Sequence, residues 1–210
     1  DLPQPLIYSA WIQALERPLL RDEVGPELLP ELLQGNEQRI KALLQPDSLF
    51  CDDRGTQPTE SCDDIIRLAL DDALAGLVKA YGEEPAEWRW GAAHFARFDH
   101  PIFGFVPVVA GLTAYDVATD GGQDTVNRGA GNFAAPLPEA FRHRHGPGLR
   151  VVFDLADLDQ SLFMIATGQS GNLMSPHYGD LAQRWADGVA VKLVGGATAA
   201  GSTLRLTPAH

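Results

Sequence analysis

The chain has 210 residues, of which 45% are hydrophobic, and it carries 28 Asp and Glu against 16 Lys and Arg, for a net charge of −12. Such an acidic chain repels phosphate backbones and anionic lipid surfaces, so we expect neither nucleic acid nor a membrane among its partners. No apolar run reaches the roughly 18 residues that a transmembrane helix needs. The length suffices for one sizeable core.

The first 45 residues predict helices with interruptions. Apolar residues from Leu6 to Leu15 recur at helical spacing, Pro18 disturbs the run, and Gly25-Pro26 breaks it. We expect a short helix over residues 27–33. A further helix should begin after Asn36, whose side chain can cap it.

The clearest helix runs from Ser61 to about Gly82. Ser61 can cap its first turn, Asp64 favours the positive end of the helix dipole, and Gly82 suits a left-handed cap. One apolar face is predicted, made of Ile66, Leu70, Ala73, Leu74 and Leu77.

From about Glu87 the pattern changes to short apolar segments divided by Gly, Pro and Asp. Extended structure is predicted over residues 88–91, 93–98, 107–110 and 125–127, and strands over 149–155, 161–166 and 203–206. The strands at 149–155 and 161–166 should pair antiparallel, and a helix is expected over 178–186. Helices followed by antiparallel strands are typical of the α+β class. We expect one segment, mainly helical over 1–86 and rich in strands over 87–210.

Two cysteines, Cys51 and Cys62, flank a loop that contains Gly55 and Pro58. The glycine and proline let this segment turn back on itself, which would allow a disulfide. The alternative is two unrelated small apolar residues. No histidine stands near enough to complete a zinc site, so we expect no metal here.

Several polar motifs resemble catalytic or metal sites. Gly168-Gln169-Ser170-Gly171-Asn172 is similar to a nucleophile elbow, but the last glycine is replaced and Pro176 follows closely. We therefore expect Ser170 and His177 to be structural parts of a loop. His143 and His145 lack an acidic or cysteine partner, so loop histidines are favoured over metal ligands. The acidic residues from Asp47 to Asp72 do not match a calcium loop and favour a solvated surface.

Six aromatic residues lie close together, and they are Trp88, Trp90, Phe95, Phe98, Phe103 and Phe105. They could line an acyl-binding pocket. Their spacing is equally natural for side chains that pack in a core or against the rest of a larger protein. We favour this packing role over the acyl-binding pocket.

Five segments together resemble the C-terminal part of the β-chain of penicillin acylase family amidases, which are N-terminal nucleophile hydrolases. They are residues 168–172, 175–180, 124–129, 88–103 and 145–155. The resemblance implies an αββα sandwich to which the predicted strands contribute. Gly179 departs from the pattern, because relatives tend to carry an acidic residue there.

The resemblance implies an amide-hydrolysing acylase of the penicillin or acyl-homoserine lactone type. The family's nucleophile is the first residue of its β-chain, whereas residue 1 here is Asp, so we assign no catalytic, cofactor or metal residue to this chain. A calcium ion, where the complete enzyme binds one, should be held by residues outside the chain. The alternative is a non-catalytic binding or scaffolding domain of the same fold.

The resemblance also favours a disulfide between Cys51 and Cys62 and a periplasmic or secreted protein. The expected partners are the remaining segments of the acylase precursor and an acyl-amide substrate. The isolated chain is expected to be inactive and to self-associate, because strands of the sandwich would be missing.

Overall fold

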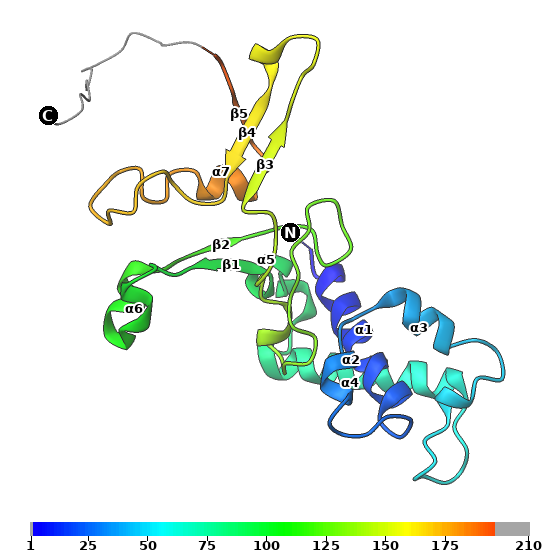
Figure 1. Ribbon diagram of the computed structural model, residues 1–210. Coiled ribbons are helices and arrows are strands. Elements are labelled where there is room, and N and C mark those ends of the chain that lie inside the picture. Colours follow the sequence, from blue (N-terminus) through cyan, green and yellow to red (C-terminus); the bar gives the residue numbers. More distant parts are fainter. Residues whose placement is uncertain (1, 196–210) are drawn as a thin grey trace, which may run out of the picture.

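The structure is a computed structural model that describes residues 2–195 (Figure 1). Helices dominate residues 4–81, and the described strands lie between residues 95 and 192. This arrangement confirms the predicted α+β class. The predicted strand over 203–206, and His210, lie outside the described residues.

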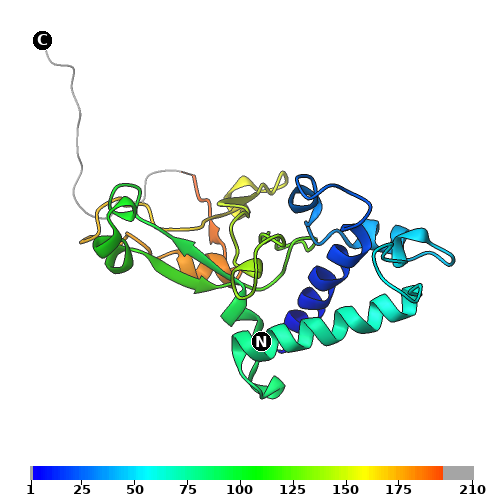
Figure 2. The ribbon, with the colours of Figure 1, turned by 90° about the horizontal axis from the view of Figure 1, so that it is seen from below.

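Four helices form the first body, with α1 (Gln4–Leu20) packed against α4 (Cys62–Tyr81) (Figure 2). The short helices α2 (Leu29–Leu32) and α3 (Glu37–Leu43) follow α1. Pro18 lies inside α1 without ending it, so the break comes at residues 21–28. Asn36 caps α3 as predicted, because its side-chain oxygen accepts the Arg39 amide at 2.9 Å.

Helix α4 begins and ends where the sequence predicts. Ser61 and Asp64 form a reciprocal capping box, and Gly82 follows the helix with a φ of 94°. The predicted apolar face is rotated by one residue over the first two turns. Ile65 and Ala69 are buried there, whereas Ile66 lies at the edge of the core. Because residues 65 and 66 are both apolar, the helical spacing of apolar residues is compatible with burying either one.

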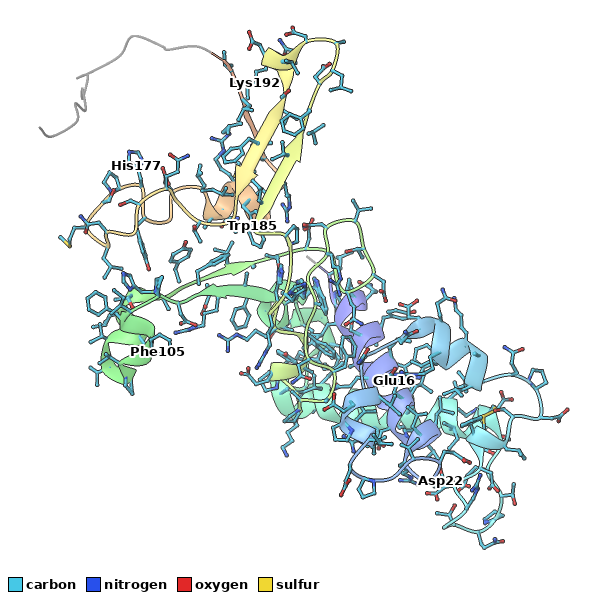
Figure 3. The ribbon with its side chains drawn as sticks, viewed as in Figure 1. Glu16, Asp22, Phe105, His177, Trp185 and Lys192 are labelled. Carbon is cyan, nitrogen blue, oxygen red and sulfur yellow. A yellow bond between two sulfur atoms is a disulfide. The ribbon has the colours of Figure 1, made fainter. Side chains whose placement is uncertain are left out.

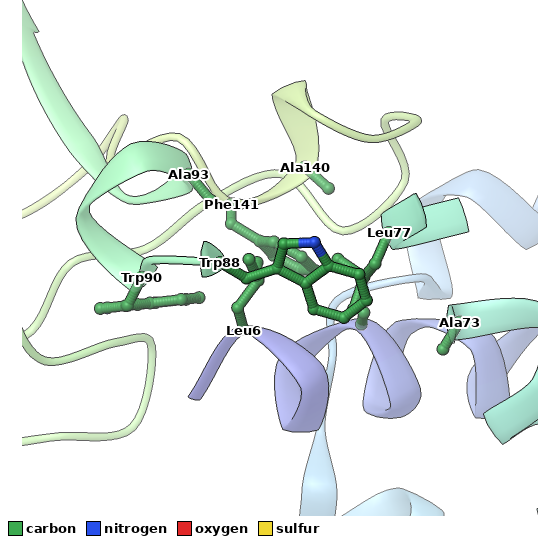
Figure 4. Close-up of a cluster of buried hydrophobic side chains, with 9 residues drawn as sticks. Leu6, Ala73, Leu77, Trp88, Trp90, Ala93, Ala140 and Phe141 are labelled. Atoms are coloured by element: carbon green, nitrogen blue, oxygen red, sulfur yellow. The ribbon is translucent and has the colours of Figure 1, made fainter. Parts of the chain in front are cut away.

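The first core joins the helical body to the segments that follow it. Figure 4 shows Trp88 enclosed by Leu6, Leu77 and Phe141, and each of these four side chains is at most 2% exposed. The Trp88 indole also donates to the carbonyl of Gly82 at 3.0 Å. Burying side chains of this size stabilises by about 2 kcal/mol each.

A two-stranded antiparallel ribbon leaves this core. It pairs β1 (Phe95–Phe98) with β2 (Tyr115–Ala118), and α6 (Pro107–Thr113) lies at its far end (Figure 1). Two expectations are wrong here. Residues 107–110 are helical because Pro107 occupies the first helical position, where its fixed φ is favourable. Trp90 opens the short helix α5 (Trp90–Ala93) instead of extended chain.

A three-stranded antiparallel sheet completes the strand-rich part. β3 (Leu149–Val152) pairs with β4 (Leu162–Ile165) as predicted, and β4 also pairs with β5 (Val191–Lys192). The predicted helix over 178–186 is reduced to α7 (Ala182–Ala186), because turns occupy its first residues. A second core packs this sheet, α7 and the ribbon around Trp185.

Single turns of 3₁₀ helix connect these elements. They are η1 (Leu49–Cys51), η2 (Pro85–Glu87), η3 (Phe103–Phe105), η4 (Glu139–Phe141) and η5 (Leu158–Gln160). None of the helices between residues 2 and 195 combines the length and hydropathy of a bilayer span.

Candidate functional site

Cys51 and Cys62 form a disulfide, with their Cα atoms 4.9 Å apart. The bond ties η1 to the first residue of α4 and closes the acidic loop between them. Arginines hold this loop to the end of α1, since Arg21 pairs with Asp53 and Arg54 pairs with Glu23 at 2.6 Å. The loop is therefore a fixed surface feature beside the helical body.

The acidic side chains of this region make internal hydrogen bonds. The Gly55 amide and Arg21 both lower the pKa of Asp53, and the Thr56 hydroxyl lowers the pKa of Glu60. No cluster of three or more His, Cys, Asp or Glu able to hold a metal ion occurs in residues 2–195.

Ser170 lies in a loop held by its own polar groups. Its hydroxyl accepts the Asn172 amide at 3.1 Å, and its amide donates to the carbonyl of His177 at 3.0 Å. The His177 ring turns instead to Asp180, with Nδ1 2.8 Å from the carboxylate. These contacts describe a folded loop rather than a nucleophile beside its base.

Gly179 lies against the ring of Tyr115. A Cβ atom at this position would come within 3.1 Å of the ring carbons of Tyr115. The acidic residue that the resemblance implies at this position would therefore require this ring to shift.

A buried polar cluster of His94, Thr119 and His143 lies where the helical body meets the strands. His94 is 1% exposed, with Nδ1 2.9 Å from the Thr119 hydroxyl and Nε2 2.9 Å from the carbonyl of Gly129. The His143 Nδ1 atom lies 3.1 Å from the same hydroxyl. The rings of His94 and His143 are stacked, at 5.2 Å between centroids.

The His94 ring lies between two carbonyl oxygens, because Nδ1 is 2.9 Å from the carbonyl of Thr119 and Nε2 is 2.9 Å from that of Gly129. Both carbonyls accept, so each is positioned to accept a hydrogen bond from the ring nitrogen that faces it. The Thr119 hydroxyl lies within hydrogen-bond distance of Nδ1 of both rings and can also donate to the carbonyl of His94 at 3.3 Å. Burial first, and then the electrostatic interactions with His94, Arg150 and His145, lower the pKa of His143 to about 4. Gly129 is required because any side chain would collide with the His94 ring.

Thr119 lies between the imidazoles of His94 and His143, and this arrangement is the one in the cluster that most resembles a nucleophile beside a base. Thr119 is only 4% exposed, however, so the carbonyl of a substrate cannot reach its hydroxyl. The cluster instead joins the residue before β1, the residue after β2 and the segment before β3. Sequence reasoning missed it, because its members are 25 and 24 positions apart and no motif spans them. Of His143 and His145, weighed from the sequence as loop histidines or metal ligands, only His143 belongs to the cluster, and His145 is exposed.

A second series of hydrogen bonds between polar side chains positions the segment 124–129. Arg150 on β3 donates to the side chain of Asn127, and Asn127 donates to Asp120. Arg150 also donates to the carbonyl of Trp185 at 2.7 Å and lies over its ring. The loop is thereby fixed to the second core, which leaves Val126 fully in solvent.

A hollow of about 530 Å³ lies between α1, α4 and residues 133–137. The Gln13 amide at its edge donates to the carbonyls of Phe133 and Ala135, at 2.9 and 2.7 Å. Apolar side chains such as Leu68 and Leu137 line most of it. No nucleophile paired with a base lines this hollow. Of the six aromatic residues considered for an acyl pocket, Trp88 and Trp90 are buried in the core, whereas Phe105 is exposed.

Comparison with known proteins places these features in a family. A model of the penicillin amidase family matches residues 1–199. The acyl-homoserine lactone acylase QuiP of Pseudomonas syringae pv. syringae (strain B728a) is 27% identical over 193 residues, which is 87% of this chain and 23% of that protein. The penicillin acylase 2 proenzyme of Pseudomonas sp. (strain SE83) is 31% identical over 117 residues, which is 56% of this chain and 15% of that protein.

The fold is also found in a solved structure. The thermostable penicillin G acylase from Alcaligenes faecalis superposes with a TM-score of 0.51 at 17% identity, over 99% of this chain and 39% of that chain. This likeness supports the predicted N-terminal nucleophile hydrolase fold. The chain spans about a quarter of the length of the QuiP acylases that it matches. Because the family model matches residues 1–199, this chain belongs to the penicillin amidase family.

Proposed function

We propose that these residues are a supporting segment of an amide-hydrolysing acylase whose nucleophile lies elsewhere in a longer polypeptide. The observation that carries the proposal is the family match over residues 1–199 in a chain that spans only 23% of the relative QuiP. The segment contributes three packed hydrophobic clusters, and the segments around Thr119, Gly129 and His143 meet at the buried histidine cluster.

The chemistry proposed for the complete enzyme is acyl transfer. The hydroxyl of an N-terminal residue attacks the amide carbonyl, its own α-amino group accepts the proton, and amide donors stabilise the oxyanion. That proton passes to the leaving amine as the C–N bond breaks, and water then hydrolyses the acyl-enzyme, which releases the acid and restores the hydroxyl. This segment supplies none of those groups in the proposal, since Thr119 is buried and Ser170 is engaged within its loop.

The proposed substrate is a penicillin, an acyl-homoserine lactone or a related acyl amide. The names of the relatives, a penicillin acylase and acyl-homoserine lactone acylases, support this class. We also propose a periplasmic or secreted location. The disulfide between Cys51 and Cys62 supports it, because such bonds persist in oxidising compartments.

The test compares purified residues 1–210 with the complete protein, using a penicillin and an acyl-homoserine lactone as substrates. The complete protein should cleave at least one amide, and the isolated chain should cleave neither. Light scattering on the isolated chain should show self-association. Turnover by the pure chain would contradict the location of the nucleophile, and a complete protein that cleaves no acyl amide would favour the scaffolding alternative.

A further inference from the structure

The turn between β1 and β2 carries no charged side chain. Residues 100–115 contain no Asp, Glu, Lys or Arg, although these make up 21% of the chain and a run of this length would hold about three. In an acidic protein, a charge-free surface segment of this length points to a surface that is covered in the working molecule.

Six large apolar side chains of this turn are exposed, and the ring of one of them, Phe103, packs against His100. The other five are here called the apolar tip. They are Ile102 (71% exposed), Phe105 (87%), Val106 (46%), Val108 (82%) and Leu112 (84%). Figure 3 shows Phe105 at the end of the ribbon, far from the helical body. Single exposed apolar residues are ordinary, but a group of five on one short hairpin marks an interaction surface.

The apolar tip is held rigidly at its base. The His100 ring is 8% exposed, and its Nδ1 atom accepts the amides of Ile102 and Phe103 at 3.1 and 3.2 Å. Nε2 therefore carries the proton and faces the carbonyl of Gly171 at 3.3 Å. At the other end, the Tyr178 hydroxyl donates to the carbonyl of Thr113 at 3.1 Å. The exposed side chains are thus presented by a fixed backbone.

The chemistry of the apolar tip selects an uncharged protein surface as its partner. Arg97, at the base of the ribbon, is paired with Asp99 and Asp116 at 3.0 and 3.4 Å, so it offers little attraction to an anionic membrane. A large amount of protein is available to cover the tip. The chain accounts for only 23% of the relative QuiP and 39% of the matched penicillin G acylase chain.

We propose that the apolar tip docks against a part of the same acylase polypeptide that lies outside residues 1–210. This inference rests on the proposed function, because it requires the longer protein. Docking of this kind would bury α6 on the side that faces solvent here and would hold the ribbon to the remainder of the enzyme.

The direct test places the photo-crosslinking amino acid p-benzoylphenylalanine at Val108 of the complete protein. Leu49, which is 78% exposed beside the disulfide loop, gives the matched control position. After irradiation, mass spectrometry should find Val108 joined to peptides outside residues 1–210, in at least tenfold higher yield than the background from unirradiated protein. Mixing isotopically labelled and unlabelled protein separates contacts within one molecule from contacts between two.

A second measurement uses a charge at the same place. Val108→Glu puts a carboxylate near the N-terminus of α6, where the helix dipole favours it, so α6 itself should form. We expect at least a tenfold loss of assembled, soluble protein for this variant, and less than a twofold loss for Leu49→Glu.

The outcomes are distinct from those that test the proposed function. The proposal is overturned if Val108 cross-links only to residues 1–210, only to a second molecule, or to no protein, whether or not the enzyme is active. Binding to lipid vesicles without a protein cross-link would likewise overturn it. A complete protein that cross-links as expected but cleaves no acyl amide would refute the proposed function alone.

Discussion

The carboxylate of Glu16 offers a quantitative test of how the helical body is held together. Glu16 lies on α1 and is 1% exposed. Its two oxygens accept the Gly35 amide at 2.6 Å, the Asn36 amide at 2.8 Å and the Arg39 guanidinium at 2.6 Å. One buried charge thus fixes the turn between α2 and α3 to α1.

We predict that Glu16→Gln destabilises the chain by about 3 kcal/mol. The substitution keeps the volume but replaces one acceptor oxygen by an NH₂ group, which must face the donors of Gly35, Asn36 or Arg39. Breaking a buried ion pair costs about 3–5 kcal/mol, and the retained amide oxygen keeps the value at the lower end.

The assay is urea unfolding of residues 1–210 followed by circular dichroism. Glu23→Gln is the matched control, because Glu23 pairs with an Arg54 side chain that is 63% exposed. Such exposed pairs contribute at most about 1 kcal/mol. If the two variants lose the same free energy of unfolding at equal denaturant slopes, the assignment of Glu16 as the anchor of this turn is wrong.

Three further predictions concern single features. Peptides from unreduced protein should contain the Cys51–Cys62 bond, and replacing both cysteines by Ala should cost about 3 kcal/mol; two free thiols in oxidised, folded protein would contradict this. Ser170→Ala in the complete enzyme should leave acyl-enzyme formation largely intact, whereas a loss of several orders of magnitude with folding preserved would make Ser170 a catalytic candidate. The folded-state pKa of His143, about 4, is below its ordinary value, so the unfolded state binds the proton first as the pH falls. The contribution of neutral His143 to the free energy of unfolding should be fully present above pH 6.5 and should decrease by about 1–2 kcal/mol toward pH 4. This decrease should be absent in His143→Gln.

Local signals explain which elements the sequence could predict. The ends of α4 follow from Ser61, Asp64 and Gly82, because capping groups act within one turn of the helix. The pairing of β3 with β4 follows from two β-rich runs separated by a short turn. These features depend on neighbours in sequence, so no knowledge of the fold was needed.

Short apolar runs were harder to interpret. Residues 107–110 read equally well as strand or helix, and Pro107 at the first helical position decided the outcome. The strands β2 and β5 were not predicted, because each has at most four residues and is fixed by pairing with a distant partner. In the same way, the cluster of His94, Thr119 and His143 arises from packing between segments that are far apart in the sequence.

The most direct test of the central claim is to locate the nucleophile of the complete protein chemically. An acylating reagent that reacts with catalytic hydroxyl or thiol groups is added, and the labelled peptide is identified by mass spectrometry. The account predicts one label, which inhibits turnover, on the N-terminal residue of a chain segment outside residues 1–210. An inhibitory label within residues 1–210, on Ser170 for example, would contradict it.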